Sequence, residues 1–155
     1  MKRPPSTDSC APRSGARRAL LRATFASAAL LLAMPAVAQD ARQSLVQGIA
    51  RDWVAIVDAG RYEDSWKAAG AKFRLAITPA RWADSVAKVR APLGKLVKRT
   101  VLRINFTRTF PGVPEGDYAI VIFRTAYANR DDGDETVTLE READGVWRVI
   151  GYVVR

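Results

Sequence analysis

The apolar positions in the first part of the chain recur with the period of an α-helix. In segment 39–58 they stand four residues apart, at Leu45, Ile49, Trp53 and Val57, with Val46, Ala50 and Val54 beside them. Gly60 ends the helix that this pattern predicts, and a second short helix is expected over 61–69. Residues 71–77 are expected to form a connector that carries Phe73.

A third helix is predicted from its start signal. Thr78 is a suitable N-cap, and Pro79 suits the first helical position. The pattern predicts that the helix buries Trp82, Val86 and Val89 and that it exposes Arg81, Asp84, Lys88 and Arg90. Pro92 ends the helix and begins a turn that continues to Gly94.

After residue 99 the hydrophobic period changes from about 3.6 to about 2, which indicates strands. In segment 100–110, one face is predicted to carry Leu102, Ile104 and Phe106, and the other Arg103, Asn105 and Thr107. Segment 118–127 is apolar on both faces at its centre, which is typical of a central or doubly covered strand.

Segment 135–155 carries the strongest hairpin signal, because strand-forming residues flank Ala143-Asp144-Gly145. We predict a three-residue loop with Gly145 in the left-handed conformation, since a two-residue turn would place Arg141 opposite Arg148. The predicted register pairs Glu140 with Arg148. It also brings five apolar side chains to the inner face: Val137, Leu139, Trp147, Val149 and Val153.

These elements predict an α+β fold. Three N-terminal helices precede four antiparallel strands, so the helices are expected to pack on one side of a curved four-stranded sheet. The 117 residues of segment 39–155 are enough for a single domain with its own core. Because many aromatic residues face inward, we expect a cone around a narrow cavity.

Residues 1–38 have the pattern of a secretory signal peptide. Basic residues precede an apolar run over 23–34, and a small-residue cleavage site follows, with cleavage expected after Ala38. We therefore expect the periplasm as the location, with secretion as the alternative. Arg17-Arg18 resembles a twin-arginine signal, but an ordinary basic segment explains it equally well. Neither this run nor any later segment has the length that a transmembrane helix needs.

The composition excludes several kinds of site. The chain carries a formal net charge of +9, but residues 39–155 hold 19 Lys and Arg against 15 Asp and Glu, so a nucleic-acid partner is not expected. The chain has no histidine, and its one cysteine is Cys10. Segment 39–155 therefore has no thiol nucleophile, disulfide, histidine triad or zinc site built on Cys or His, and we expect neither a cofactor nor a metal ion.

Several motifs spread over nearly all of segment 39–155 point to a known family. They include Gly60-Arg61-Tyr62, Ser65-Trp66, Arg90-Ala91-Pro92-Leu93-Gly94, residues 111–118, and Trp147-Arg148-Val149-Ile150-Gly151-Tyr152. These motifs resemble the exported bacterial proteins known as domain of unknown function 4019. The resemblance implies a nuclear-transport-factor-2-like cone, an architecture also used by ketosteroid isomerases and polyketide cyclases. It implies no established activity.

Aromatic side chains are the first candidates for a ligand site. Six of them are expected to point inward: Trp53, Tyr62, Trp66, Phe73, Trp82 and Trp147. They are candidates for lining a cavity that takes a small hydrophobic ligand. Core packing explains the same residues, because aromatic side chains dominate the energetics of protein cores.

Glu135 is the second candidate, since the predicted register turns its carboxylate inward, where it needs cations or hydrogen-bond donors. The first interpretation is a buried ion pair, with Arg90 and Arg99 as the expected partners. The second is the polar end of a pocket, in which Arg99 holds an anionic ligand and Tyr118 or Tyr152 donates a hydrogen bond. The third is a general base, with Tyr118 as the second acid.

The outward positions of the predicted sheet are also apolar. They include Ile120, Ile122, Ile150 and Tyr152. An exposed apolar patch of this kind often marks an interface, so we expect a homodimer that pairs sheet against sheet.

Two functional hypotheses follow. The first is a non-catalytic periplasmic domain, which binds a small ligand if its cavity is open and a partner protein if the cavity is filled. The second is a cofactor-independent isomerase, dehydratase or hydrolase that uses Glu135. The second hypothesis requires an inward carboxylate that arginine leaves free.

Overall fold

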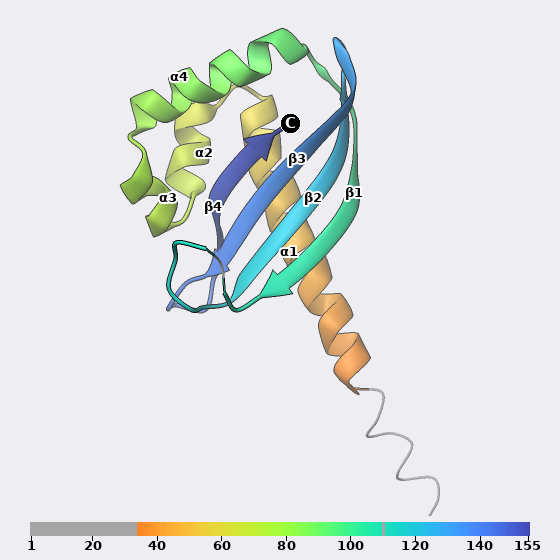
Figure 1. The fold of residues 1–155 in the computed structure, drawn as a ribbon, viewed down its shortest axis with the longest axis vertical. Coiled ribbons are helices and arrows are strands. Elements are labelled where there is room, and N and C mark those ends of the chain that lie inside the picture. Colours follow the sequence, from red (N-terminus) through yellow and green to blue (C-terminus); the bar gives the residue numbers. More distant parts are fainter. Residues whose placement is uncertain (1–33, 110) are drawn as a thin grey trace, which may run out of the picture. The chain divides into compact units, whose positions relative to one another are not determined.

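Four helices precede an antiparallel sheet of four strands in the described part of the chain (Figure 1). The computed structural model describes residues 34–155 except residue 110, so most of the predicted signal peptide lies outside the described residues. Contacts divide the chain into residues 1–38 and 39–155, and the second unit carries the fold described below. The α+β class is confirmed, with four helices where the sequence predicted three.

The elements follow one another in a simple order. The helices are α1 (Met34–Asp58), α2 (Tyr62–Ala68), α3 (Ala71–Ala76) and α4 (Pro79–Arg90), followed by a 3₁₀ turn over Ala91–Leu93. The strands are β1 (Leu96–Thr107), β2 (Tyr118–Tyr127), β3 (Arg130–Arg141) and β4 (Trp147–Val154). Their order in the sheet is β1-β2-β3-β4, so each strand pairs with its neighbour in sequence and the sheet is open.

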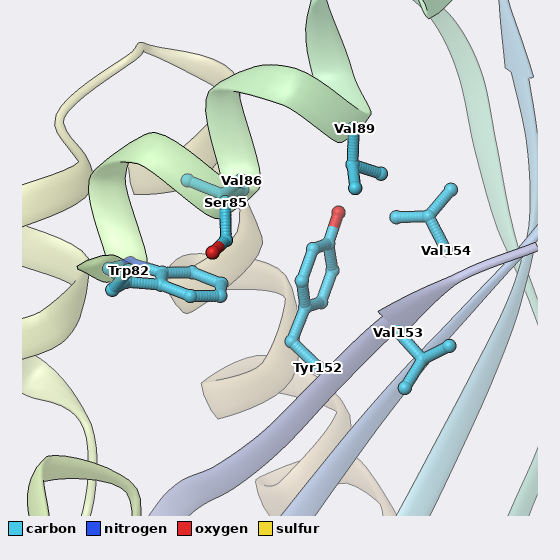
Figure 2. Close-up of a pocket in the computed structure, with 7 residues that line it drawn as sticks. All are labelled: Trp82, Ser85, Val86, Val89, Tyr152, Val153 and Val154. Atoms are coloured by element: carbon cyan, nitrogen blue, oxygen red, sulfur yellow. The ribbon is translucent and has the colours of Figure 1, made fainter. Parts of the chain in front are cut away.

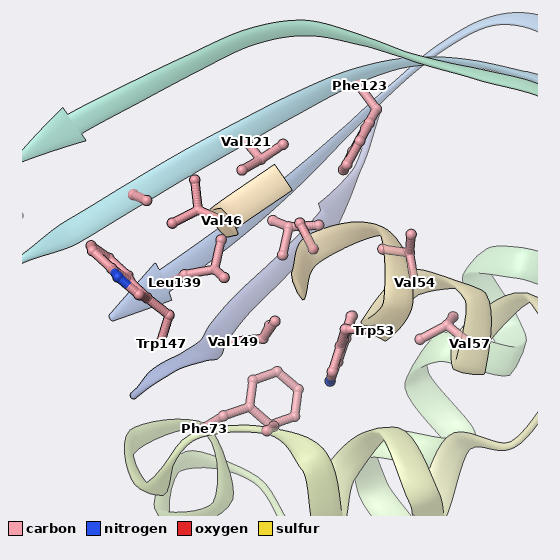
Figure 3. Close-up of a cluster of buried hydrophobic side chains, with 14 of the residues drawn as sticks. Val46, Trp53, Val54, Val57, Phe73, Val121, Phe123, Leu139, Trp147 and Val149 are labelled. Carbon is pink, nitrogen blue, oxygen red and sulfur yellow. The ribbon is translucent and has the colours of Figure 1, made fainter. Parts of the chain in front are cut away.

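One apolar core lies between α1 and one face of the sheet (Figure 3). Val54 and Val57 of α1 belong to this core together with Val121 and Phe123 of β2, and Trp53 of α1 points toward Phe73 of α3. The buried stripe of α1 is turned slightly from the predicted one, because Val46 and Ala50 are fully buried whereas Leu45 is 54% exposed.

The segment expected to be a connector is helix α3. It contains helix-favouring alanine, lysine, arginine and leucine, and it buries Phe73. With six residues it is too short to show a recurring apolar period, which explains why the sequence pattern did not reveal it.

Helix α4 begins as predicted. The Thr78 side chain accepts a hydrogen bond from the Arg81 amide, and Pro79 occupies the first helical position. The buried stripe runs through Trp82, Val86 and Arg90, each four residues apart. Val89 is therefore 47% exposed and Arg90 only 8% exposed, the reverse of what the sequence predicted for these two residues.

The terminal hairpin has the predicted loop. Glu140 pairs with Arg148, and the Glu142 amide donates to the Val146 carbonyl at 3.0 Å around a three-residue loop. Gly145 has a φ of +80°, in the left-handed region.

Two β-bulges place some residues on a face of the sheet that the sequence pattern did not predict. In β1 the register shifts between Val101 and Arg103, which leaves Leu102 unpaired and 55% exposed. In β4 the register shifts opposite Thr138 and Leu139, which leaves Ile150 as the extra residue. The predictions that Leu102 and Val153 face inward and that Tyr152 faces outward are therefore wrong, whereas Ile104 and Phe106 pack against the core as predicted.

Alanine at Gly145 and at Gly48 should change stability in opposite directions. Gly145→Ala places a side chain at a φ of +80°, so the free energy of unfolding should fall by about 1 kcal/mol. Gly48→Ala, inside α1 and with nothing within 4 Å of the added Cβ, should raise it by about 0.5–1 kcal/mol. Urea unfolding followed by tryptophan fluorescence measures both, and changes of the same sign would contradict the loop conformation.

Candidate functional site

The Glu135 carboxylate of β3 is fully buried and both of its oxygens are occupied. Oε1 accepts hydrogen bonds from Arg90 Nη1 at 2.9 Å and from the Tyr152 hydroxyl at 2.6 Å. Oε2 accepts from Arg99 Nε at 2.5 Å and from Thr125 Oγ1 at 2.8 Å. The sequence-based interpretation of an inward carboxylate held by Arg90 and Arg99 describes this geometry.

A second carboxylate, Asp58 at the end of α1, completes the site. Arg99 binds it with both terminal nitrogens, Nη1 at 2.6 Å from Oδ2 and Nη2 at 3.0 Å from Oδ1. Arg90 Nη2 also donates to Asp58 Oδ1. We call the group of Asp58, Arg90, Arg99 and Glu135 the charge cluster. It contains two cations and two anions, so its formal charge is zero.

Sequence reasoning missed Asp58, although the chain carried a signal for it. An acidic residue at the C-terminal end of a helix is unfavourable beside the helix dipole unless a cation lies close by. Asp58 stands at the end of α1, immediately before the turn at Gly60. The two arginines of the charge cluster supply the required cations.

Tyrosines surround the charge cluster, but not all of those that were predicted. Tyr127, which the sequence analysis did not single out, accepts a hydrogen bond from Arg90 Nη1 at 2.8 Å. Tyr118 lies elsewhere, where its hydroxyl donates to the Pro114 carbonyl at 2.7 Å and accepts from Lys72 Nζ at 3.1 Å. It pairs with Glu140, about five residues or 17 Å along β3 from Glu135.

The pKa shifts indicate fixed protonation states. Burial acts to raise the pKa of Glu135, but hydrogen bonding and the charge of Arg99 outweigh it and lower that pKa below 4.5. Burial also acts to lower the pKa of Arg99, yet hydrogen bonds with Asp58 and Glu135 raise it well above its ordinary range. Burial and the charge of Glu135 both raise the pKa of Tyr152. Glu135 thus remains a carboxylate, Arg99 a cation and Tyr152 a neutral phenol near pH 7.

The predicted aromatic residues lie in the packed interior or against it. Trp53 packs on Trp82 with ring centroids 5.8 Å apart, and Phe73 meets Trp82 edge to face at 4.9 Å. Trp147 meets Phe106 at the other end of the core, at 6.1 Å. Tyr62 and Trp66 are partly buried against the same cluster.

The indole N–H groups are also used within the fold. Trp53 Nε1 donates to the Ser65 carbonyl at 2.8 Å, and Trp82 Nε1 donates to Ser65 Oγ at 2.9 Å. Trp66 Nε1 donates to the Ile77 carbonyl at 2.8 Å. No buried side-chain nitrogen or oxygen of the described residues lacks a hydrogen-bond partner.

Two surface hollows approach the charge cluster. One of about 230 Å³ lies between α4 and β4, and Tyr152 forms part of its wall (Figure 2). Another of about 310 Å³ is lined in part by Asp58, Arg90 and Lys95. Arg99 and Glu135 line neither hollow, so neither is the predicted pocket that ends in these two residues.

This arrangement limits the chemistry available at Glu135. A general base needs a free lone pair directed at the proton it removes, whereas an arginine occupies each oxygen of Glu135. Within the described part of the chain, no three acidic, histidine or cysteine side chains gather so as to hold a metal ion.

The comparison with protein families gives one result. The family model described as "Protein of unknown function (DUF4019)" matches residues 49–152. The chain belongs to this family. The matched range includes every member of the charge cluster and all four strands except the last two residues of β4. No curated protein and no solved structure matches this DUF4019 chain.

Among the described residues, no helix combines the length and the apolar character needed to cross a bilayer.

Removing one charge from the charge cluster should strongly destabilise the protein. Glu135→Gln keeps the shape of the side chain but leaves two buried arginines facing one carboxylate, so the free energy of unfolding should fall by about 3 kcal/mol. Asp84→Asn, at the exposed pair with Lys88, is the matched control and should have little effect. Chemical denaturation of both variants measures the difference. Equal losses would show that the charge cluster contributes no more than a surface pair.

The contribution of Glu135 to the free energy of unfolding should also depend on pH. Its pKa in the folded protein lies below the ordinary 4.5 of the unfolded chain, so the unfolded state binds the proton more readily. Its stabilising effect is therefore complete above about pH 5 and is lost as the pH falls through the folded-state pKa. Denaturation of wild type and Glu135→Gln between pH 7 and pH 3 should show the stability difference shrinking with acidity. A difference that stays constant would contradict this assignment.

Proposed function

We propose that this DUF4019 protein is an exported, non-catalytic association module that binds proteins through its surface. The basic and apolar N-terminal segment with its small-residue site at Ala38 supports export to the periplasm. Four helices against an open antiparallel sheet suit the nuclear-transport-factor-2-like architecture that the family resemblance implies, and this architecture is part of the proposal.

The filled interior is the observation that carries the proposal. Trp53, Phe73 and Trp82 pack on one another where a ligand cavity was one of the sequence-based possibilities. The charge cluster uses its hydrogen-bonding groups on itself and on neighbouring tyrosines and Thr125. Among the described residues, no buried side-chain nitrogen or oxygen is left free to bind a ligand, which favours function at the surface.

The outer face of the sheet, which is the face turned away from the core, offers such a surface. Residues directly opposite each other on neighbouring strands point to the same face. The pairings give one row of Asn105, Ile120, Thr138 and Gly151, and a second row of Arg103, Ile122, Thr136 and Val153. We call these eight residues the outer rows.

The outer rows suit contact with another flat surface. Their centre consists of Ile120 and Ile122 with two threonines, and Val153 at one end is 46% exposed. The β4 bulge removes Tyr152 from the predicted set. Ile150 does not belong to the rows, because its Cγ2 lies only 3.1 Å from where a Cβ on Gly70 would stand.

We infer a homodimer in which the outer rows of two copies face each other. A two-fold axis makes such a contact self-complementary, and stacked sheets pack about 10 Å apart. Ile120 and Ile122 are half-buried in the described chain, and contact with a partner would bury the rest of their apolar surface.

One alternative remains as a candidate function. The hollow of about 310 Å³ beside Arg90 and Lys95 supports binding of a small anionic ligand. The predicted use of Glu135 in acid–base catalysis does not meet its requirement for a carboxylate that arginine leaves free, because both oxygens of Glu135 are paired with arginine.

Ile122→Arg should convert the proposed dimer into monomers. The substitution places like charges opposite each other at the centre of the outer rows, so the dimer dissociation constant should rise by about 100-fold or more. Leu75→Arg, at an 87% exposed residue of α3, is the control and should leave the dimer intact. Sedimentation velocity at micromolar protein measures the result. A wild-type protein that sediments as a monomer would refute the dimer.

Native mass spectrometry of the protein purified from the periplasm measures the oligomeric state independently and detects any retained ligand. The expected species is a dimer without additional mass. A retained small molecule would instead support the ligand-binding alternative.

A further inference from the structure

Strand β4 lies at one edge of the sheet, and part of its backbone is unpaired. The edge position follows from the strand order β1-β2-β3-β4. An exposed strand edge presents N–H and C=O groups that another strand can bind, and proteins usually cover or block it. Strand β4 contains neither proline nor lysine, the residues that most often block an edge.

The pairing with β3 shows which groups are free. Asp134 and Arg155 exchange both backbone hydrogen bonds, at 3.0 and 2.9 Å. Bonded and non-bonded pairs alternate in an antiparallel ladder, so Val153 bonds to β3 whereas Tyr152 and Val154 turn their N–H and C=O groups away from it. Among the described residues, no other backbone group takes up these four groups.

The other half of the same edge is closed. The Gly70 amide donates to the Val149 carbonyl at 2.7 Å, and Gly70 packs against Ile150 and Arg148. The open part therefore runs from Tyr152 to Arg155, about 13 Å for four residues in extended conformation.

An apolar groove runs beside this open edge (Figure 2). It is the hollow of about 230 Å³ between α4 and β4. Figure 2 shows Trp82, Val86 and Val89 on the α4 side and Tyr152 with Val154 on the β4 side. A strand edge next to an apolar groove under a helix provides backbone hydrogen bonds and a side-chain pocket together, the two requirements for binding an extended peptide.

We propose that the edge of β4 and the groove beside α4 bind an extended segment of a partner protein, which adds to the sheet as a further strand. Alternate residues of the segment point to the same side, so aliphatic residues two positions apart enter the groove. The inference rests on the proposed association function and deepens it by naming a partner class. It uses the edge of β4 rather than the outer face of the sheet, and it shares Val153 with the outer rows.

The charges around the groove favour a segment with acidic ends. Arg81 lies one helical turn before Ser85 of the groove wall, and Arg155 follows Val154 at the other side. Within the described residues neither arginine side chain has a carboxylate partner, whereas Asp84 and Lys88 pair with each other at 2.7 Å. Acidic residues flanking the aliphatic ones therefore complement the site.

A second copy of the chain fits this edge poorly. Helices α2, α3 and α4 lie beside β4 (Figure 1). Antiparallel pairing of two β4 edges about a two-fold axis would bring both sets of helices to the same junction. A short segment without helices avoids this collision.

The test uses a fluorescein-labelled peptide, Asp-Val-Thr-Val-Asp with an amidated C-terminus, and fluorescence anisotropy. We expect a dissociation constant of about 10–100 μM, in the range of short peptides held mainly by backbone bonds. N-methylation of the central residues removes the backbone donors and should weaken binding about tenfold or more. Lysine in place of both aspartates should weaken it as well.

Variants of the protein test the same contacts from the other side. Val154→Pro removes one edge donor that β3 does not use, so it should weaken peptide binding about tenfold with little change in melting temperature. Val89→Asp places a negative charge in the groove and should also weaken binding. Leu75→Asp, at an exposed residue outside the groove wall, is the matched control and should bind as wild type does.

Hydrogen exchange locates the bound peptide. The amides of Tyr152 and Val154 should become protected about tenfold or more when the peptide binds, whereas the already bonded amide of Val153 should change little. The proposal is overturned if the N-methylated peptide binds equally well, or if no binding is detected at about 1 mM peptide. It is also overturned if the amides of Tyr152 and Val154 are already protected without peptide. Protection that rises with protein concentration would show that a second copy of the chain covers the edge. Protection that does not depend on concentration would show that the chain itself covers it.

The two proposals fail separately. If the peptide does not bind but Ile122→Arg dissociates a wild-type dimer, the outer rows are the association surface and the β4 edge is not. Peptide binding by a monomeric wild type leaves the β4 edge as that surface.

Discussion

The fold depends on the mutual neutralisation of four buried charges. Asp58 closes α1, Arg90 closes α4, Arg99 lies on β1 and Glu135 on β3, so each charge comes from a different element. A buried charge without a partner costs several kcal/mol, whereas the complete set satisfies each member by charge-assisted hydrogen bonds. The four elements must therefore pack against one another with all four charges in place, and the charge cluster fixes where the helices end relative to the strands.

The short connection between α4 and β1 makes this convergence possible. Only nine positions separate Arg90 from Arg99, and the chain must reverse between them. The 3₁₀ turn and Gly94, with a φ of +76°, provide the reversal, and Asn129 Nδ2 donates to the Pro92 carbonyl from the β2–β3 turn. Both arginines thereby reach the same two carboxylates. The turn that ends in Gly94 is thus part of the geometry of the charge cluster.

Sequence patterns predicted most of the elements and three of the four members of the charge cluster. The Thr78-Pro79 start and the hairpin around Gly145 depend on local chemistry, and local chemistry is visible in the sequence. Glu135 was found because its register position turned a carboxylate inward. Asp58 and Tyr127 were missed because their partners are distant in sequence, and the bulges at Leu102 and Ile150 were missed because an inserted residue reverses facing without changing composition.

The bulge at Ile150 connects the buried site with both proposed surfaces. Without it, the alternation from Val149 onward would turn Tyr152 outward and Val153 inward, as the sequence pattern predicted. Glu135 would then lose the 2.6 Å hydrogen bond from the Tyr152 hydroxyl, and the second outer row would lose its valine. The residues next to Tyr152 and Val154, rather than these two, would then carry the free N–H and C=O groups of the β4 edge. One extra residue therefore sets the composition of the charge cluster, the outer rows and the groove edge at once, so a change at this position should affect all three together.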